Sequence, residues 1–223
     1  MTRDDAIHLL RSYLDEQLHD PALAQVLAGA VHDCLLDWSV PTAALDGVAA
    51  VIALAFGCRR LPNGNTVPGP MNERVADVVA GLYAELGCPV YAQWEVAEAL
   101  GGRVPEGMLH TIYPDQATDG SGVAYLSTFG VLQKVRNAVG DPGRLGTVLV
   151  AAWRHHAPRC IRLARGLSFE AFAPPRPLPD TYDVESAQSW TRSAHAYLLH
   201  DGLARLERHR AALFPDSSPS GLL

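Results

Sequence analysis

The chain has 223 residues, of which 48% are hydrophobic and 19% are charged, and its formal net charge is -6 at pH 7. A chain of this length buries roughly 70–75% of its unfolded surface, which is enough for one core with helical additions. The acidic balance and the scattered arginines argue against nucleic-acid binding, and no apolar run reaches the ~20 residues that a membrane-spanning helix needs. The amino terminus lacks the basic-then-apolar order of a signal peptide, so we expect a cytoplasmic protein.

Four cysteines stand far apart, at Cys34, Cys58, Cys88 and Cys160, and none forms a CxxC pair. This spacing predicts neither a zinc motif nor a disulfide framework. We therefore expect four reduced thiols, most of which fill the core.

The chain divides into a helical beginning, an α/β middle and a helical end. Residues 1–45 carry apolar side chains at spacings of three and four and predict a helical segment. Residues 46–175 alternate apolar runs with amphipathic stretches and predict a Rossmann-like α/β core. Residues 182–214 predict a helix packed on this core, and residues 215–223 predict a disordered tail.

Five short apolar runs in the middle region predict strands, at residues 46–57, 89–92, 109–113, 148–152 and 169–173. The first run is apolar throughout, which is typical of a central parallel strand buried on both faces. Right-handed crossovers between the runs predict a doubly wound, mainly parallel five-stranded sheet, for which we expect the order 3-2-1-4-5. That order reverses between the first and fourth strands, which is where open α/β sheets bind ligands.

Two loops are expected at this reversal. Residues 58–70 contain too much Pro, Gly and Asn for a regular element, so we predict a mobile lid over the ligand. The other loop carries His155 and His156 between the fourth strand and a helix that opens at Pro158. Arg159 follows one helical turn beyond His156.

Several motifs follow one another in a fixed order between residues 46 and 173. A Gly-containing loop after the first strand precedes Asn72-Glu73-Arg74, Trp94-Glu95, Ser127-Thr128 and finally His156-Ala157-Pro158-Arg159. In this order they resemble the YdcF/SanA/ElyC-like bacterial proteins, and the strand, H-x-x-R and helix unit is the most specific part. The resemblance implies a Rossmann-like fold without an NAD fingerprint and a nucleotide-like ligand, of which S-adenosylmethionine is one candidate.

The residues expected at the site have two roles. His156 and Glu95 are the candidate catalytic residues, because both side chains serve as general acids or bases and an imidazole exchanges protons near neutral pH. The candidate ligand-binding residues are Arg74, Arg159, His155, Asn72, Ser127, Thr128, Gly57 and Gln93. The two arginines are expected as anion clamps, since a cation at a helix N-terminus opposes the helix dipole and needs a reason to be there.

Each of these residues also has a purely structural interpretation. His155 and His156 are equally typical of a surface loop, and as neighbours they point apart. Glu95 suits any helix N-terminus, and Ser127 or Thr128 suits a helix cap better than a nucleophile.

Three functional classes stay open. The first is a small-molecule enzyme that binds an anionic ligand between the first and fourth strands, with His156 as acid or base and Arg74 and Arg159 as clamps. The second is a module that binds such a metabolite without turning it over. The third, a metal-dependent hydrolase using His155, His156, Glu95 and Asp115, lacks any close ligand spacing, and we expect no metal. The sequence determines neither the ligand nor the oligomeric state.

Overall fold

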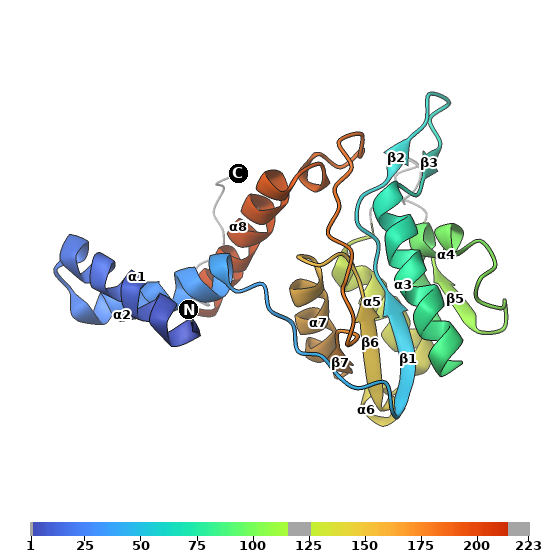
Figure 1. Cartoon of the computed structure of the whole chain (residues 1–223), viewed down its shortest axis with the longest axis horizontal. Coiled ribbons are helices and arrows are strands. Elements are labelled where there is room, and N and C mark those ends of the chain that lie inside the picture. The colour runs from blue at the N-terminus through green and yellow to red at the C-terminus, as the bar shows by residue number, and fades with distance from the viewer. Residues whose placement is uncertain (1, 116–125, 214–223) are drawn as a thin grey trace. The chain divides into compact units, whose positions relative to one another are not determined.

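The structure is a computed structural model that describes residues 2–115 and 126–213. The chain forms two compact units (Figure 1). One combines Met1–Trp38 with Ala194–Leu223, and the other is the continuous stretch Ser39–Ser193. No helix in the described ranges is long and apolar enough to cross a membrane.

The Ser39–Ser193 unit is built on a five-stranded parallel sheet with the order β5-β4-β1-β6-β7. Its strands are β1 (Val48–Ala53), β4 (Val90–Gln93), β5 (Leu109–Ile112), β6 (Thr147–Ala151) and β7 (Glu170–Phe172). In chain order these are strands 3-2-1-4-5 of the sheet, so the predicted fold class and strand order are confirmed. The central strand β1 pairs with β4 on one side and with β6 on the other.

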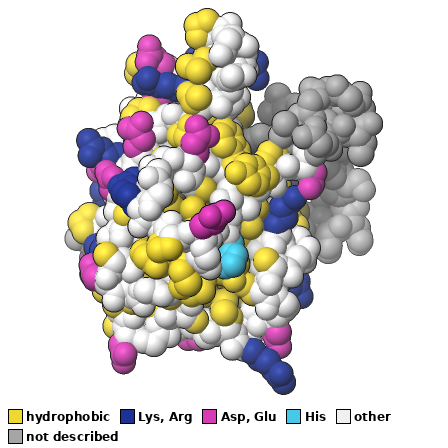
Figure 2. Space-filling view, turned by 90° about the vertical axis from the view of Figure 1, so that its right-hand side faces the viewer, with side chains coloured by type: hydrophobic (Ala, Val, Ile, Leu, Met, Phe, Trp, Pro, Cys, Tyr) yellow, Lys and Arg dark blue, Asp and Glu magenta, His cyan; other side chains and the backbone are white. Residues whose placement is uncertain are grey.

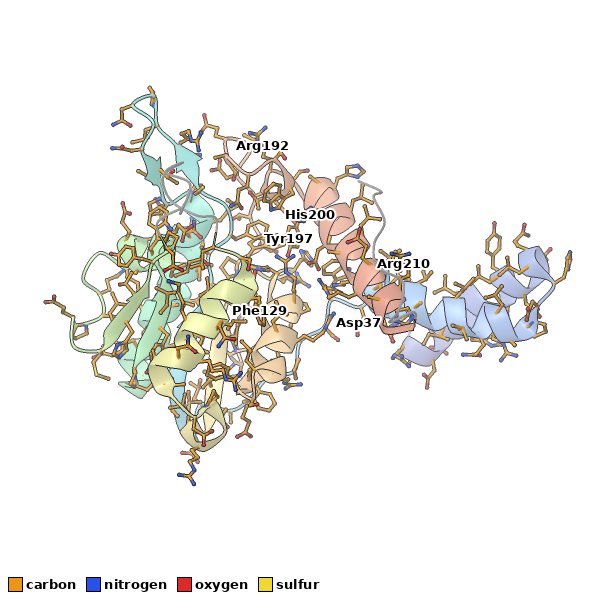
Figure 3. All side chains as sticks on the ribbon, turned by 180° about the vertical axis from the view of Figure 1, so that it is seen from behind. Asp37, Phe129, Arg192, Tyr197, His200 and Arg210 are labelled. Carbon is orange, nitrogen blue, oxygen red and sulfur yellow. The ribbon has the colours of Figure 1, made fainter. Side chains whose placement is uncertain are left out.

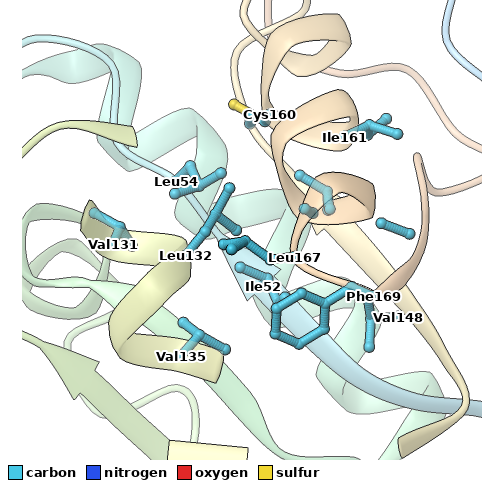
Figure 4. Packing of buried hydrophobic residues seen from close by; sticks show 14 of the residues in the cluster. Ile52, Leu54, Val131, Leu132, Val135, Val148, Cys160, Ile161, Leu167 and Phe169 are labelled. Atoms are coloured by element: carbon cyan, nitrogen blue, oxygen red, sulfur yellow. The ribbon is translucent and has the colours of Figure 1, made fainter. Parts of the chain in front are cut away.

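Helices cover both faces of this sheet (Figure 1). They are α3 (Pro70–Leu86), α4 (Trp94–Leu100), α5 (Thr128–Val139), α6 (Pro142–Leu145) and α7 (Ala157–Gly166). Because successive strand residues point to opposite faces, Ile52 packs with α5 and α7, whereas Val51 packs with α3 and α4. Figure 4 shows the first cluster, in which Leu132 and Phe169 lie beside Ile52. Burial on both faces explains why β1 is apolar throughout.

The starts of the helices decide which polar groups face the sheet edge. Ser127 caps α5, as predicted, because its side chain accepts a hydrogen bond from the Gly130 amide. The cap of α3 is Gly69, and the helix begins at Pro70. Proline loses no hydrogen bond at the first helical position, so the helix can begin at Pro70. Asn72 therefore lies inside the first turn.

The segment between β1 and α3 contains regular structure, contrary to the prediction. Strands β2 (Arg59–Arg60) and β3 (Thr66–Val67) form an antiparallel hairpin. Asn63 makes the turn, because its side-chain oxygen accepts a hydrogen bond from the Asn65 amide. The same Asn and Gly residues that suggested an irregular loop therefore close a hairpin.

The end of the chain also differs from the prediction. The expected helix at 182–214 is shorter, since α8 spans Ala194–Leu213 and is preceded by the 3-10 turn η2 (Ser189–Thr191). Residues 179–187 form an irregular segment with a turn at residues 184–185, and this segment contacts the loops after β1 and β6. The predicted disordered tail lies outside the described residues.

The helical unit combines α8 with α1 (Arg3–Leu18), α2 (Pro21–Val31) and the π-helix η1 (His32–Leu36). Helix α8 is grouped with the N-terminal helices, and the expected packing of α8 on the sheet core stays a prediction. Tyr197, His200 and Arg210 mark its course in Figure 3. The buried Arg205 fastens α8 to the N-terminal segment, because its guanidinium pairs with Asp201, donates to the Asp37 carbonyl and stacks on Trp38.

Candidate functional site

The loops that follow β1, β4 and β6 meet at the carboxyl edge of the sheet. Phe56 and Gly57 follow β1, Glu95 follows β4, and His156 follows β6. Ligands of open α/β sheets bind at this edge, where strand carbonyl ends and helix amide ends converge. The polar side chains gathered here are therefore the candidate site.

His156 links the beginnings of two helices. Its Nε2 lies 3.0 Å from the hydroxyl of Thr128, the first residue of α5. The same nitrogen lies 3.1 Å from Nη2 of Arg159, in the first turn of α7. Three of the predicted site residues are thus brought together, and the H-x-x-R spacing places the arginine against the histidine ring as expected.

The hydrogen bond from Arg159 determines the protonation of His156. A guanidinium only donates, so Nε2 accepts and the neutral ring carries its proton on Nδ1. Burial and the charge of Arg159 both disfavour an imidazolium and hold the pKa of His156 well below its usual range. The imidazole, with 5% of the residue exposed, is therefore a base in its neutral form at pH 7.

Ser127 and Thr128 have separate roles. Ser127 is occupied as the cap of α5, whereas the Thr128 hydroxyl points to His156. A hydroxyl within hydrogen-bonding distance of a neutral imidazole is the arrangement of a nucleophile and its base, or of a proton relay. Phe129, the next residue, is half exposed on α5 (Figure 3).

Aromatic rings fill the space directly between the ends of β1 and β6. The rings of Phe56 and Trp153 stack with centroids 4.3 Å apart, and Tyr182 meets Trp153 edge-on at 4.5 Å. His155 packs against the same Trp153 at 4.9 Å. Each such ring pair contributes about 0.5–1.5 kcal/mol beyond its burial.

The irregular segment 179–187, called the strap below, was missed by sequence reasoning. Trp153 donates through Nε1 to the Thr181 carbonyl, and the Arg154 amide donates to the Pro179 carbonyl. Asp183, 3% exposed, receives two hydrogen bonds from Arg59 of the β2–β3 hairpin. The sequence signal was an Asp and a Tyr after a Pro-rich stretch, which alone predicts only a linker.

Gly57 and Asn72 shape the loop after β1. The buried Asn72 carboxamide accepts from the Phe56 amide and donates to the Gly57 carbonyl. Gly57 has φ +71°, and a Cβ there would lie 2.7 Å from the hydroxyls of Ser186 and Thr191. Both predicted ligand-binding residues therefore hold the backbone of this loop in place.

Glu95 and Gln93 form a second polar pair at the end of β4. The Gln93 carboxamide oxygen accepts from the Ala55 amide, and its nitrogen lies 3.4 Å from Oε1 of Glu95. Burial raises the pKa of Glu95 to about 7, with a smaller contribution from the charge of Glu98. Glu95 is thus partly protonated near neutral pH.

Two predicted residues lie apart from the histidine cluster. Arg74 has a side chain 68% exposed and forms an ion pair at 3.7 Å with Asp77, one turn along α3. Asp115, which the metal-hydrolase interpretation required, pairs with Lys134. In the part of the chain that the structure describes, no group of three or more His, Cys, Asp or Glu residues could hold a metal ion.

Charges of both signs are dispersed over the face of the molecule drawn in Figure 2. Lys and Arg side chains there stand singly among acidic and apolar ones. This face therefore carries no basic patch of the kind that follows a phosphate backbone.

Comparison with known proteins gives no match to any family model, to any curated protein or to any solved structure.

Proposed function

We propose that the chain is a small-molecule enzyme that binds an anionic ligand at the carboxyl edge of its sheet, with His156 as the proton-transferring group and Arg159 as the anion clamp. The observation that carries the proposal is the contact of both the Thr128 hydroxyl and the Arg159 guanidinium with Nε2 of His156. An imidazole held against a hydroxyl and a cation is suited to acid–base chemistry on an anion.

Arg159 serves as a switch in this scheme. Its hydrogen bond occupies the single lone pair of Nε2. An anionic ligand binds a guanidinium more strongly than a neutral imidazole does, so it draws Arg159 away and frees Nε2. The freed nitrogen accepts a proton from Thr128 or from the ligand. The anion also removes part of the positive field that disfavours protonation, which raises the pKa of His156 at the moment when a proton must be taken up.

The ligand class follows from the clamp. A phosphate or carboxylate is the partner that a guanidinium selects, and a nucleoside part adds aromatic surface for contact with the exposed Phe129 ring. S-adenosylmethionine, implied by the resemblance to the YdcF/SanA/ElyC-like proteins, belongs among the first ligands to be tested. Mass spectrometry of small molecules released on denaturation identifies the native ligand directly.

The decisive test compares the two neighbouring histidines. Once turnover of the identified ligand is measured, His156→Ala should lose about 10²–10⁴ in rate, the usual contribution of a positioned acid or base. His155→Ala should lose less than about tenfold, because its ring packs on Trp153. Thr128→Val, which keeps the shape of the side chain, reports whether the hydroxyl takes part.

The alternative is a module that binds the same metabolite without converting it. It predicts tight binding, recovery of intact ligand after incubation, and equal effects of the three variants on affinity alone. Equal rate losses in both histidine variants would contradict the role given to His156.

A further inference from the structure

Glu95 is a buried carboxyl group that the His156 chemistry does not use. The residue is 7% exposed and stands at the start of α4, directly after β4. Its Oε1 faces the Gln93 nitrogen, and Gln93 is itself fixed by the Ala55 amide at the end of β1. Its Oε2 is buried and has no hydrogen-bond partner among the residues that the structure describes.

A buried oxygen of this kind is costly unless something binds it. Leaving a polar group unsatisfied away from water costs about 1–3 kcal/mol, and more when the group is charged. Native proteins keep such groups mainly where a ligand, ion or water completes them. In the Glu95 carboxyl group, Oε1 already faces Gln93, so Oε2 can accept from a single hydrogen-bond donor of a ligand.

The charges around Glu95 indicate the sign of that donor. Burial raises the pKa of Glu95 most; hydrogen bonds from its own backbone amide and from Gln93 lower this pKa, and the charge of Glu98, three residues along the same helix, raises it. Burial also raises the pKa of the half-buried Cys58 thiol most, and Glu95 adds to that rise. Arg60 acts on Cys58, and no basic side chain of the described residues is among the groups that set the Glu95 pKa. The surroundings therefore favour a positive charge at Oε2.

We propose that Glu95 binds a primary ammonium group of a small ligand, which completes Oε2. An ammonium is preferred over a guanidinium because Oε1 already faces Gln93, so the two-pronged pairing that guanidinium groups favour is obstructed. The inference rests on the proposed function only in placing both subsites on one ligand, which then carries an amine and an anionic group. Adjacent strands lie about 4.8 Å apart, and β1 separates β4 from β6, so the two charges are separated by roughly 10 Å or more.

The experiment follows the side-chain carboxyl carbon of Glu95 by NMR in the full chain labelled at glutamate, with ethylammonium as the probe. Ethylammonium should lower the pKa of Glu95 by about one unit or more, which corresponds to at least tenfold tighter binding to the ionised carboxylate. Tetramethylammonium has the same charge but no N–H donor and should shift this pKa by far less. The variant E98Q should keep the response, whereas E95Q should remove ethylammonium binding.

A second arm separates this inference from the proposed function. Inorganic phosphate, followed through the His156 ring resonances, reports on the Arg159 subsite. If phosphate binds and ethylammonium leaves the Glu95 resonance unchanged, the ammonium subsite is overturned and the proposed function stands. If ethylammonium binds and phosphate does not, the ammonium subsite stands and the anion clamp is overturned. An equal response to tetramethylammonium would overturn the requirement for an N–H donor.

Discussion

Two buried titratable groups at the same sheet edge respond to burial in opposite directions. Burial lowers the pKa of His156, whose charged form is the protonated one, and raises that of Glu95, whose charged form is the ionised one. At neutral pH the His156 ring is therefore uncharged and the Glu95 carboxyl is partly protonated. A site with little net charge of its own leaves the recognition of a charged ligand to Arg159 and to the proton that Glu95 gains or loses.

The pH dependence of stability should reveal Glu95. Its pKa of about 7 lies above the ordinary value of 4.5, so the folded state holds the proton more tightly than the unfolded state. Stability from this group is fully present below pH 4.5 and is lost as pH rises to about 7, by a total of about 3 kcal/mol. Glu95→Gln should remove that loss, so urea unfolding should find the variant more stable than wild type at pH 8 and close to it at roughly pH 4.5. A constant difference across this range would contradict the raised pKa.

Anion binding should separate two arginines that the sequence treats alike. Arg159→Ala should weaken binding of inorganic phosphate by about 1.5–3 kcal/mol, the range for a hydrogen bond to a charged group. Arg74→Ala is the matched control, because its exposed side chain pairs with Asp77 on its own helix. Isothermal calorimetry of both variants is the measurement. An equal loss of phosphate affinity in both variants would show that Arg74 also binds the anion.

The sequence predicted part of the residue-scale arrangement. The H-x-x-R spacing and the pair Ser127-Thr128 are local patterns, and local patterns determine which residues begin a helix. The contact of Thr128 with His156 joins residues 28 positions apart, and neither motif predicts it. The contacts of Tyr182 and Asp183 were not predicted, because nothing in a Pro-rich stretch indicates which loop it will contact.

At the scale of elements, the strand order was predictable because a chain of parallel strands and right-handed crossovers has few compact solutions. The β2–β3 hairpin was not, because it contributes little apolar surface and depends on contacts with a segment more than a hundred residues later. Arg59 supplies these contacts through Asp183 and Glu185. The expected lid is therefore a hairpin whose base is held by these contacts and whose tip, residues 61–65, is exposed, and the mobility of this tip stays a prediction.

Hydrogen exchange tests this division of the hairpin. The amide of Ala187, bound to the Cys58 carbonyl, should exchange far more slowly than the amides at the exposed tip. Arg59→Ala leaves the buried Asp183 carboxylate without its guanidinium and should cost about 1–3 kcal/mol, with faster exchange in both the hairpin and the strap. Arg60→Ala, at the exposed neighbouring position, should leave both unchanged. Tip amides protected as strongly as those of β6 in the unliganded protein would exclude a mobile lid.

At the scale of the whole molecule, the α/β unit is one continuous stretch of sequence. It lies in the sequence between the two stretches that form the helical unit. Both core clusters of the sheet and all its strand pairs lie within Ser39–Ser193. The helical unit is built from two separate stretches of chain, which Arg205 of α8 joins through its contacts with Asp37 and Trp38.

A fragment spanning residues 39–193 should therefore fold alone. We expect cooperative urea unfolding and dispersed amide resonances that match those of the same residues in the full chain. A fragment of residues 1–38 should be largely unfolded, because two short helices with few buried side chains lack the partner supplied by α8. Circular dichroism of both fragments is the measurement, and a molten 39–193 fragment would show that the helical unit is needed for the sheet.

The divided helical unit also has a consequence during synthesis. Translation at about 5–20 residues per second leaves roughly 8–30 seconds between the emergence of residue 38 and that of residue 194. Throughout this interval α1 and α2 lack α8, the third long helix of their unit. Leu9, Tyr13 and Val26 are among the side chains of these two helices that are exposed even in the folded protein. Helices α1 and α2 can therefore complete their unit only after α8 has been synthesised.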